Sequence, residues 1–417
     1  MNHDSPLTIA QAAKAASVEL ANTDPSRLAS VLESLAALIE GESAEILAAN
    51  QLDIDAARGS GLPPAKLQRL ALTQADIASL ARSVRAVSAL PAPQGVITSD
   101  TIAQPSGLRV QKVRMPLGVI AMIYEARPGV TVDAFSLCLR SGNACILKGG
   151  KEAAHSNAAL MSLIERALVQ HGLARASAQL VTTSDRVVIA ELLACEGLID
   201  LVIPRGGAEL VSFVRQHSRI PVLAHDRGVC HIYVHAEADL DMAERICVSA
   251  KVAAPATCNA AECVLVDRAV AEQFLPRLCN ALNNQGVEIR GDAATCKAWP
   301  AATPACESDF GAEFLSLIIA VRVVDDLGEA LAHIRQHSSN HTEAIITKSQ
   351  AAQAEFAKRV HSSCVVINAS TRNNDGASLG LGAEIGISTS RLHAYGPMGL
   401  CELTTQRFIV TGNGQIR

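Results

Sequence analysis

Aromatic side chains are scarce in this chain: they make up 3% of its 417 residues, and Trp299 is the only tryptophan. Proteins that bind single-stranded nucleic acids stack bases on aromatic rings, so this composition argues against such a surface. The formal net charge of -5 gives no electrostatic reason to bind a polyanion. No apolar run approaches the roughly 18 residues of a membrane span, and the first residues lack the regions of a signal peptide. We therefore expect a cytoplasmic protein with no nucleic-acid or membrane partner.

The sequence also lacks several short motifs that mark reactive sites. Its twelve cysteines form no CxxC pair, and most stand in apolar stretches, which predicts buried, reduced thiols without a disulfide framework. The absence of GxSxG removes the nucleophile elbow of a serine hydrolase. The absence of HExxH removes the zinc-binding helix of a metalloprotease.

Two groups of histidines have spacings that could bind zinc. The first group, His333, His337 and His341, would align on one helix face, but the polar residues 338–340 predict that the helix ends before His341. The second group, His225, Cys230, His231 and His235, would divide its side chains between the two faces of a strand. A solvated helix face and an ordinary strand are the simpler interpretations, and we expect no metal site.

Aliphatic residues are abundant, since hydrophobic residues make up 49% of the chain. A chain of this length exceeds one ordinary core, so two or three domains are expected. Short runs of Val, Ile and Leu alternate with helical stretches, which predicts parallel strands covered on both faces. These runs lie at 119–123, 144–147, 179–182, 201–203 and 231–234, and again at 263–266, 316–324, 344–347 and 364–367. The pattern predicts an α/β fold with two parallel-sheet lobes.

Helices are expected over residues 8–90, with Asp24 and Thr73 as N-caps. Residues 95–115 alternate apolar and polar around a Pro-Ser-Gly turn, which predicts a hairpin. A hairpin alone is unstable, so we expect it to pack on another part of the protein or on another subunit. The last thirty or so residues also read as extended.

Cys258 is the candidate nucleophile. It stands between small and polar residues, immediately before the apolar run 262–266, so a substrate is expected to reach it. A reachable thiol can ionise, and a thiolate attacks carbonyl carbon.

Two glycine corners could bind phosphate. Lys148, Gly149 and Gly150 follow one predicted strand, and Pro204, Arg205, Gly206 and Gly207 follow another. Backbone amides at the start of a following helix attract an anion, and the two cations would reinforce this. For the corner at Lys148, an ordinary strand–turn–helix connection without a ligand is the alternative, and it stays open. Two phosphate-binding corners on one sheet would suit a dinucleotide, with Lys148 beside a 2′-phosphate. The glycine-rich segment 380–386 is interpreted as a loop, because no strand directly precedes it.

The motifs, taken in order, resemble those of the γ-glutamyl phosphate reductase family, which is part of the aldehyde dehydrogenase superfamily. The resemblance spans nearly the whole chain at compatible spacing, and the set is specific although each motif alone is weak. The matching segments are PLGVI (116–120), YEARP (124–128), SGNA (141–144), KGG (148–150), IPRGG (203–207), TCN (257–259), NASTR (368–372), GAEIGIST (382–389) and GPMGL (396–400).

The resemblance implies a reaction: reduction of L-glutamyl 5-phosphate by NADPH to L-glutamate 5-semialdehyde and phosphate, the second step of proline biosynthesis. Cys258 would form a thioester, and Asn259 belongs to the same catalytic motif. Arg127 aligns with the oxyanion Asn of aldehyde dehydrogenases, and binding of the substrate phosphate or carboxylate is its alternative role. The stretch 225–229 lacks the Glu that activates hydrolytic water in ordinary aldehyde dehydrogenases, which favours a thioester that is reduced.

The resemblance further implies a cofactor lobe, a catalytic lobe and an oligomerisation element, hence a homo-oligomer, and functional coupling to glutamate 5-kinase. We assign 1–92 and 116–223, rejoined near 365–390, to the cofactor lobe, 224–364 to the catalytic lobe, and 93–115 with 391–417 to the oligomerisation hairpin and tail. A CoA-acylating or ordinary aldehyde dehydrogenase and a metal-binding scaffold remain alternatives. Four residues depart from the pattern of the family that the chain resembles: Glu343, Asn373, Tyr395 and Cys401.

Overall fold

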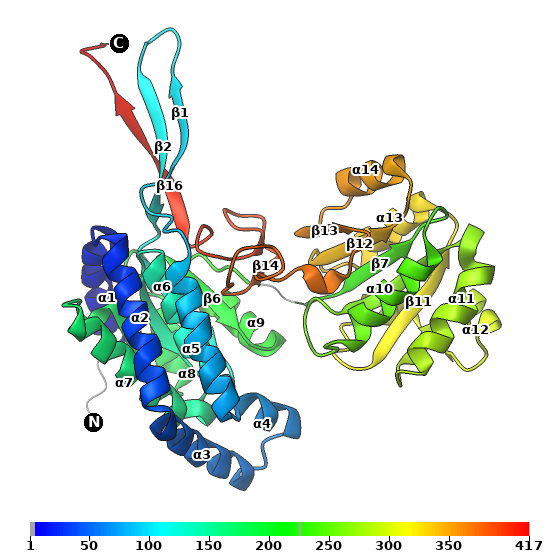
Figure 1. Ribbon diagram of the computed structural model, residues 1–417, viewed down its shortest axis with the longest axis horizontal. Helices are drawn as coiled ribbons and strands as arrows, with labels where there is room; N and C mark the ends of the chain where they lie inside the picture. Colours follow the sequence, from blue (N-terminus) through cyan, green and yellow to red (C-terminus); the bar gives the residue numbers. More distant parts are fainter. Residues whose placement is uncertain (1–4, 225–226, 417) are drawn as a thin grey trace. The chain divides into compact units, whose positions relative to one another are not determined.

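A computed structural model describes residues 5–224 and 227–416 of the chain. The described residues form two compact units (Figure 1). Unit 1 comprises residues up to Ala224 together with Gly380–Gly386 and the segment from Met398, and unit 2 comprises the remainder up to Leu379 with Ile387–Pro397. Among the described helices, none is both long and apolar enough to cross a membrane.

Unit 1 is built on a four-stranded parallel sheet in the order β5-β4-β3-β6. Three of its strands, β3, β4 and β6, are almost wholly buried, which explains their aliphatic sequence. The strands are β3 (Val119–Tyr124), β4 (Ala144–Lys148), β5 (Ala178–Leu180) and β6 (Leu201–Arg205). Pro204 is tolerated because β6 is an edge strand of this sheet.

The described part of unit 1 contains nine α-helices, some packed on this sheet and others on neighbouring helices. Asp24 and Thr73 cap α2 and α5 through side-chain bonds to backbone N–H groups, so both predicted caps are confirmed. The helices are α1 (Pro6–Ala21), α2 (Pro25–Gly41), α3 (Ser43–Gly59), α4 (Pro64–Leu70), α5 (Gln74–Ala89), α6 (Gly129–Arg140), α7 (Ala154–Gln170), α8 (Arg186–Leu193) and α9 (Ala208–His217), with the 3₁₀ turns η1 (Lys151–Ala153) and η2 (Arg175–Ser177).

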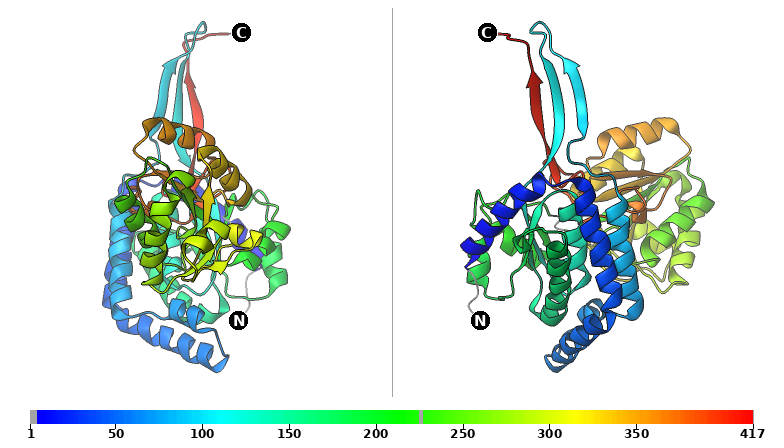
Figure 2. Two further views of the ribbon diagram at one scale, coloured as in Figure 1. Left: turned by 90° about the vertical axis from the view of Figure 1, so that its right-hand side faces the viewer. Right: turned by 60° about the vertical axis from the view of Figure 1, so that its left-hand side comes forward.

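The predicted hairpin is confirmed as β1 (Ile97–Ile102) and β2 (Arg109–Pro116). The extended C-terminal segment forms β16 (Thr404–Thr411), which pairs antiparallel with β2 along its full length. Figure 1 shows this three-stranded sheet standing out from the helical part of unit 1, and both views of Figure 2 show its strands side by side. Its side chains are largely exposed, including the apolar ones on β1 and β16.

Unit 2 holds a seven-stranded parallel sheet in the order β10-β9-β11-β8-β7-β12-β13. Its strands are β7 (Cys230–Val234), β8 (Ala261–Asp267), β9 (Glu288–Gly291), β10 (Thr303–Pro304), β11 (Ile318–Val324), β12 (Thr342–Ile346) and β13 (Cys364–Ile367). The helical elements are α10 (Leu240–Val252), α11 (Arg268–Asn283), α12 (Ala293–Ala298), α13 (Leu327–His337), α14 (Gln350–Arg359), η3 (Glu307–Gly311) and η4 (Thr371–Asn373); β14 (Ile387–Ser388) pairs with β15 (Gly396–Pro397).

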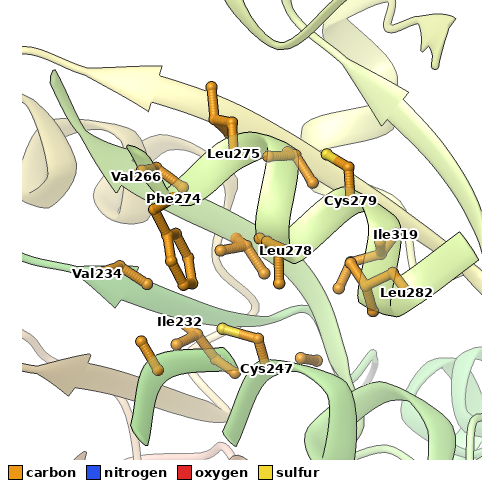
Figure 3. Close-up of a cluster of buried hydrophobic side chains, with 14 of the residues drawn as sticks. Ile232, Val234, Cys247, Val266, Phe274, Leu275, Leu278, Cys279, Leu282 and Ile319 are labelled. Carbon is orange, nitrogen blue, oxygen red and sulfur yellow. The ribbon is translucent and has the colours of Figure 1, made fainter. Parts of the chain in front are cut away.

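The sheet of unit 2 has a buried aliphatic layer on each face. On one face, α11 points Phe274, Leu278 and Leu282 toward the strands (Figure 3). Each fully buried side chain of this size contributes about 1.5–3 kcal/mol relative to exposure. The other face packs against α13 and α14 and includes Tyr233 and Leu265. Alternate residues of β7 and β8 therefore serve different layers.

The predicted α/β architecture of two parallel sheets with a small antiparallel sheet is confirmed. All nine expected strands occur, whereas β9 and β10 were not predicted because neither carries an aliphatic run. The predicted lobe boundaries stay a functional prediction. By packing alone, residues 365–379 belong to unit 2, and the chain returns to unit 1 at Gly380.

Candidate active site

Cys258 lies in the connection between α10 and β8. The connection is held in a turn, since the Thr257 hydroxyl donates to the carbonyl of Ala254 at 2.7 Å and the Ala260 amide donates to the carbonyl of Thr257 at 3.0 Å. Cys258 is half-buried, as expected for a thiol that a substrate can reach. Exposure alone does not single it out, because Cys306 and Cys401 are exposed.

The backbone of Gly228 lies directly against the backbone of Cys258. A Cβ on Gly228 would fall 2.0 Å from the carbonyl oxygen of Cys258 and 2.6 Å from its Cα. The Gly228 amide donates to Oε1 of Glu313 at 2.8 Å, and this bond holds the backbone just before β7 begins. Only glycine permits this approach, so residue 228 sets the position of the Cys258 peptide.

A second cysteine supports the same peptide group. The thiol of Cys230 donates to the carbonyl oxygen of Cys258, with Sγ at 3.2 Å. Burial raises the pKa of Cys230 well above its usual range, so its thiol stays protonated and able to donate. In the sequence, Cys230 stood out only within a group of potential metal ligands on a strand, and its spacing does not indicate this contact.

Asn259 and the segment 368–372 form one hydrogen-bonded unit. Arg372 donates from Nη1 to the Thr257 hydroxyl at 2.6 Å and to Oδ1 of Asn259. Asn259 in turn donates to the carbonyl of Asn374 at 3.2 Å, and the Thr371 hydroxyl donates to the carbonyl of Asn259 at 2.8 Å. Asn259 is buried and its side chain is used in these bonds, so it positions the Cys258 turn. Sequence reasoning noted the NASTR motif but assigned Arg372 no role.

A buried ion pair lies next to this region. Nζ of Lys251 lies 2.5 Å from Oε2 of Glu262, and both side chains are inaccessible to solvent. Burial lowers the pKa of Lys251 and raises the pKa of Glu262 to about 7. The two residues bracket the Cys258 connection, one on α10 and one on β8.

The raised pKa of Glu262 predicts a pH dependence of stability. The folded state binds a proton that the unfolded state releases near pH 4.5, so the free energy of unfolding is expected to fall as pH rises from 4.5 to 7. Each unit of pKa difference corresponds to about 1.4 kcal/mol. Glu262→Gln should flatten this dependence, measured by urea unfolding across that range. An unchanged slope in the variant would contradict the assignment.

Arg127 lies in unit 1, in the turn between β3 and α6, and its side chain is exposed. The preceding residue, Ala126, has a φ of 31°, which a residue with a Cβ rarely adopts. Its amide donates to Oε1 of Glu152 at 2.8 Å, which holds the turn in this strained form. Such strain is typical of functional turns, where it aims the next side chain.

Lys148 ends β4, and its ammonium is buried and donates to the Gly149 carbonyl at 2.5 Å. Burial lowers the pKa of Lys148. A Cβ on Gly149 would meet Nδ2 of Asn157 at 2.1 Å, and one on Gly150 would meet the Glu152 carboxyl at 2.3 Å. Packing inside unit 1 therefore explains why both positions are glycine. This favours the alternative that residues 148–150 form an ordinary strand–turn–helix corner.

The second glycine corner is more open. Arg205 ends β6, and α9 begins after Gly207, whose Cβ would meet no described atom within 4 Å. Gly207, the residue before α9, has no side chain to cap the helix, and its amide donates to the Glu125 carboxylate at 3.3 Å. Gly386 packs on the Arg205 side chain, so the loop 380–386 borders this corner. The start of α9, beside Arg205 and the open Gly207, is the part of this corner that suits a phosphate group.

The parallel strands β3, β4 and β6 are neighbours, so Arg127 and both glycine corners follow the carboxyl ends of one sheet. This is the edge at which open α/β sheets bind nucleotides, and the residues present fit a nicotinamide dinucleotide. Cys258 and Asn259 belong to unit 2. Of the stretch expected to lack a hydrolytic Glu, His225 and Asp226 lie outside the described residues.

Comparisons with known proteins agree with these observations. The model of the aldehyde dehydrogenase family matches residues 4–296. The chain is 50% identical over 387 residues to γ-glutamyl phosphate reductase of Xanthomonas campestris pv. campestris strain 8004, covering 93% of each chain. It is 48% identical to the enzyme of that name from Xylella fastidiosa strain 9a5c, covering 98% of each. The crystal structure of γ-glutamyl phosphate reductase from Thermotoga maritima superposes with a TM-score of 0.96 at 39% identity, covering 99% of this chain and all of that one.

This agreement over nearly the full chain places the protein: it belongs to the aldehyde dehydrogenase family and, within it, to the γ-glutamyl phosphate reductases.

Proposed function

We propose that this chain reduces L-glutamyl 5-phosphate to L-glutamate 5-semialdehyde and phosphate, the second step of proline biosynthesis, through a thioester on Cys258. The observation that carries the proposal is the reachable Cys258 thiol on a turn fixed by Gly228, Cys230 and Asn259. A nucleophile gains rate when its position is fixed before the substrate binds. Family membership supplies the substrate class.

The chemical steps follow from the thiol. The Cys258 thiolate attacks the acyl carbon, the tetrahedral oxyanion collapses, and phosphate leaves with its bonding electrons to give a thioester. NADPH, when bound, supplies a hydride to the thioester carbon. The resulting thiohemiacetal releases the aldehyde and restores the thiolate. Donors for the oxyanion typically contribute 10²–10³-fold in rate, and we assign the Cys258 amide and Arg127 to this task, with the substrate phosphate as the alternative partner of Arg127.

For the cofactor, we propose NADPH held at the carboxyl edge of the β3-β4-β6 sheet. Phosphates would lie at the Gly206–Gly207 helix start, with Arg205 and Pro204 shaping that corner. Lys148, with Gly149 and Gly150, would face the 2′-phosphate, because burial of its ammonium makes an anionic neighbour favourable.

The experiment that tests this function runs the reaction backwards with purified protein. Glutamate semialdehyde and NADP should give NADPH formation only when inorganic phosphate is present, monitored by absorbance. Replacing phosphate with CoA should give no product, and NAD should be at least about tenfold less efficient than NADP, equivalent to 1.4 kcal/mol. CoA-dependent or phosphate-independent oxidation would instead indicate an acylating or ordinary aldehyde dehydrogenase.

We further propose a cytoplasmic homo-oligomer built through the β1-β2-β16 sheet, with glutamate 5-kinase, which makes the labile acyl phosphate, as its functional partner. All twelve cysteines are free thiols, as in a reducing compartment. The sheet exposes Ile97 and Ile102 on β1 and Phe408 and Val410 on β16. Exposed apolar edge strands of this kind pair with another chain.

Phe408→Glu should therefore dissociate the oligomer, because the Phe408 side chain is 64% exposed in the single chain and a charge there would be buried at the interface. Size-exclusion chromatography with light scattering measures the change. Val187→Glu, a similarly exposed position on α8, is the control and should leave the mass unchanged. An unaltered mass for Phe408→Glu would remove this sheet as the interface.

A further inference from the structure

Three potential metal ligands meet inside unit 2, on the sheet face covered by α13. His231 on β7 and Cys263 on β8 are paired neighbours in the sheet, and His333 on α13 lies over them. One ligand atom from each lies within 4.8 Å of the others, and all three side chains are buried. Spacing along the chain placed His231 and His333 in two different groups, and only the fold brings them together with Cys263, because the three residues come from separate elements.

The two imidazoles in this cluster have unused nitrogens. Nδ1 of His231 lies 3.0 Å from Oε2 of Glu343, which leaves Nε2 as the nitrogen able to bind a ligand. Nε2 of His231 and Nδ1 of His333 both lack a hydrogen-bond partner among the described residues, and Nε2 of His333 is the nitrogen that faces Sγ of Cys263. A buried nitrogen without a partner costs about 1–3 kcal/mol, so the unpaired Nε2 of His231 points to a missing partner in the cluster.

Glu343 completes the arrangement expected around a bound metal. Its Oε2 accepts from both Nδ1 and the backbone amide of His231, and its Oε1 accepts from the hydroxyls of Ser338 and Ser362. Carboxylate–histidine–metal chains of this kind fix the ring and its tautomer. Glu343 is one of the departures from the family pattern, and its carboxylate is fully buried.

Charge balance favours a divalent cation here. A Cys263 thiolate and the Glu343 carboxylate would together offset a charge of two. Arg322 lies nearby on β11, where it pairs with Glu329 at 3.2 Å. A neutral imidazole donates a lone pair to a metal, and binding to Cys263 releases the proton of its thiol.

We propose that His231, Cys263 and His333 form a zinc-binding site within unit 2. Zn²⁺ prefers sulfur and imidazole ligands at about 2.3 and 2.0–2.1 Å, which places tetrahedral ligand atoms about 3.4–3.6 Å apart. Sγ of Cys263 and Nε2 of His333 already lie 3.8 Å apart. Side-chain rotation closes the remaining gap, and a water molecule provides the fourth ligand.

A metal at this site would stabilise the strands that hold the Cys258 turn. His231 follows Cys230, whose thiol holds the Cys258 carbonyl, and Cys263 stands five residues after Cys258 on the same chain segment. Zinc bound to His231 on β7 and to Cys263 on β8 would hold the register of these two strands, and the Cys258 turn leads directly into β8. Its role is therefore structural, and its loss should lower the melting temperature more than it changes the affinity for substrate.

The test measures zinc in the full-length protein without a histidine tag. Chelator-treated protein is dialysed against zinc, and bound metal is counted by mass spectrometry. We expect about one zinc per wild-type chain and at least a tenfold loss in Cys263→Ala and His333→Gln. Glu343→Gln should weaken zinc binding about 10–100-fold. His337→Gln is the matched control and should keep the metal, because His337 lies one turn away on α13 with Nε2 paired to Glu307 at 3.2 Å.

A spectroscopic measurement keeps the test valid if a variant fails to fold. Cobalt added to the wild-type protein should give the near-ultraviolet band of a thiolate–metal bond, and Cys258→Ser should retain it. A wild-type chain that binds no zinc would overturn the proposal. Loss of the band in Cys258→Ser would do the same, because the metal would then belong to the catalytic thiol, and so would full zinc content in a folded Cys263→Ala variant.

Discussion

Cys258→Ala should reduce phosphate- and NADP-dependent oxidation of glutamate semialdehyde by at least about 10³-fold while leaving the protein folded. The reaction needs a covalent thioester, and no other group on the Cys258 turn is a comparable nucleophile. The side chain is small and half-buried, so its truncation removes little packing. Steady-state rates with circular dichroism and thermal melting of the same sample measure both outcomes.

Cys401→Ala is the control for this variant. Cys401 is an exposed thiol in unit 1, so it tests whether a reactive surface cysteine accounts for the activity. It should retain full activity. Activity that survives in Cys258→Ala, or that disappears in Cys401→Ala, would refute the proposed nucleophile.

Gly228→Ala should lower kcat by at least about 10²-fold. The added Cβ would lie 2.0 Å from the carbonyl oxygen of Cys258 and 2.6 Å from its carbonyl carbon, and both are backbone atoms that cannot rotate away. The Cys258 peptide must therefore move, and a displacement of about 1 Å in a reacting group can cost about 10²-fold. Overpacking should also cost about 1–3 kcal/mol of stability.

The measurement for Gly228→Ala pairs kcat with the rate at which iodoacetamide alkylates Cys258, since a displaced thiol changes both. Gly311→Ala is the control in the same unit, because its Cβ would lie 3.6 Å from the nearest atom, an ordinary contact. A Gly228→Ala protein with lowered stability but normal kcat would show that the contact is structural only.

Local sequence patterns predicted much of the fold because each records the environment of its own residues. The aliphatic runs predicted nine strands of the two parallel sheets, and Asp24 and Thr73 marked helix starts. β9 and β10 were missed because the neighbouring strand β11 and the chain around them, rather than their own composition, hold them in the sheet. The candidate nucleophile was also visible locally, as a thiol between small and polar residues before an apolar run.

The residues that hold the Cys258 turn in position were not predictable in the same way. Cys230 reads as an ordinary buried thiol, yet it holds the carbonyl of a residue 28 positions away. Arg372 bonds to Asn259 across 113 positions. Hydrophobic pattern shows whether a side chain is buried and leaves open which distant group it contacts.

The sequence by itself determined the fold class and the family, and it singled out Cys258 as the candidate nucleophile, because these depend on periodicity and on motifs of adjacent residues. Only the tertiary structure decided why residue 228 must be glycine, which groups fix Asn259, and that His231, Cys263 and His333 meet. Those facts depend on strand order and register, which bring separate segments within bonding distance and which no local pattern encodes.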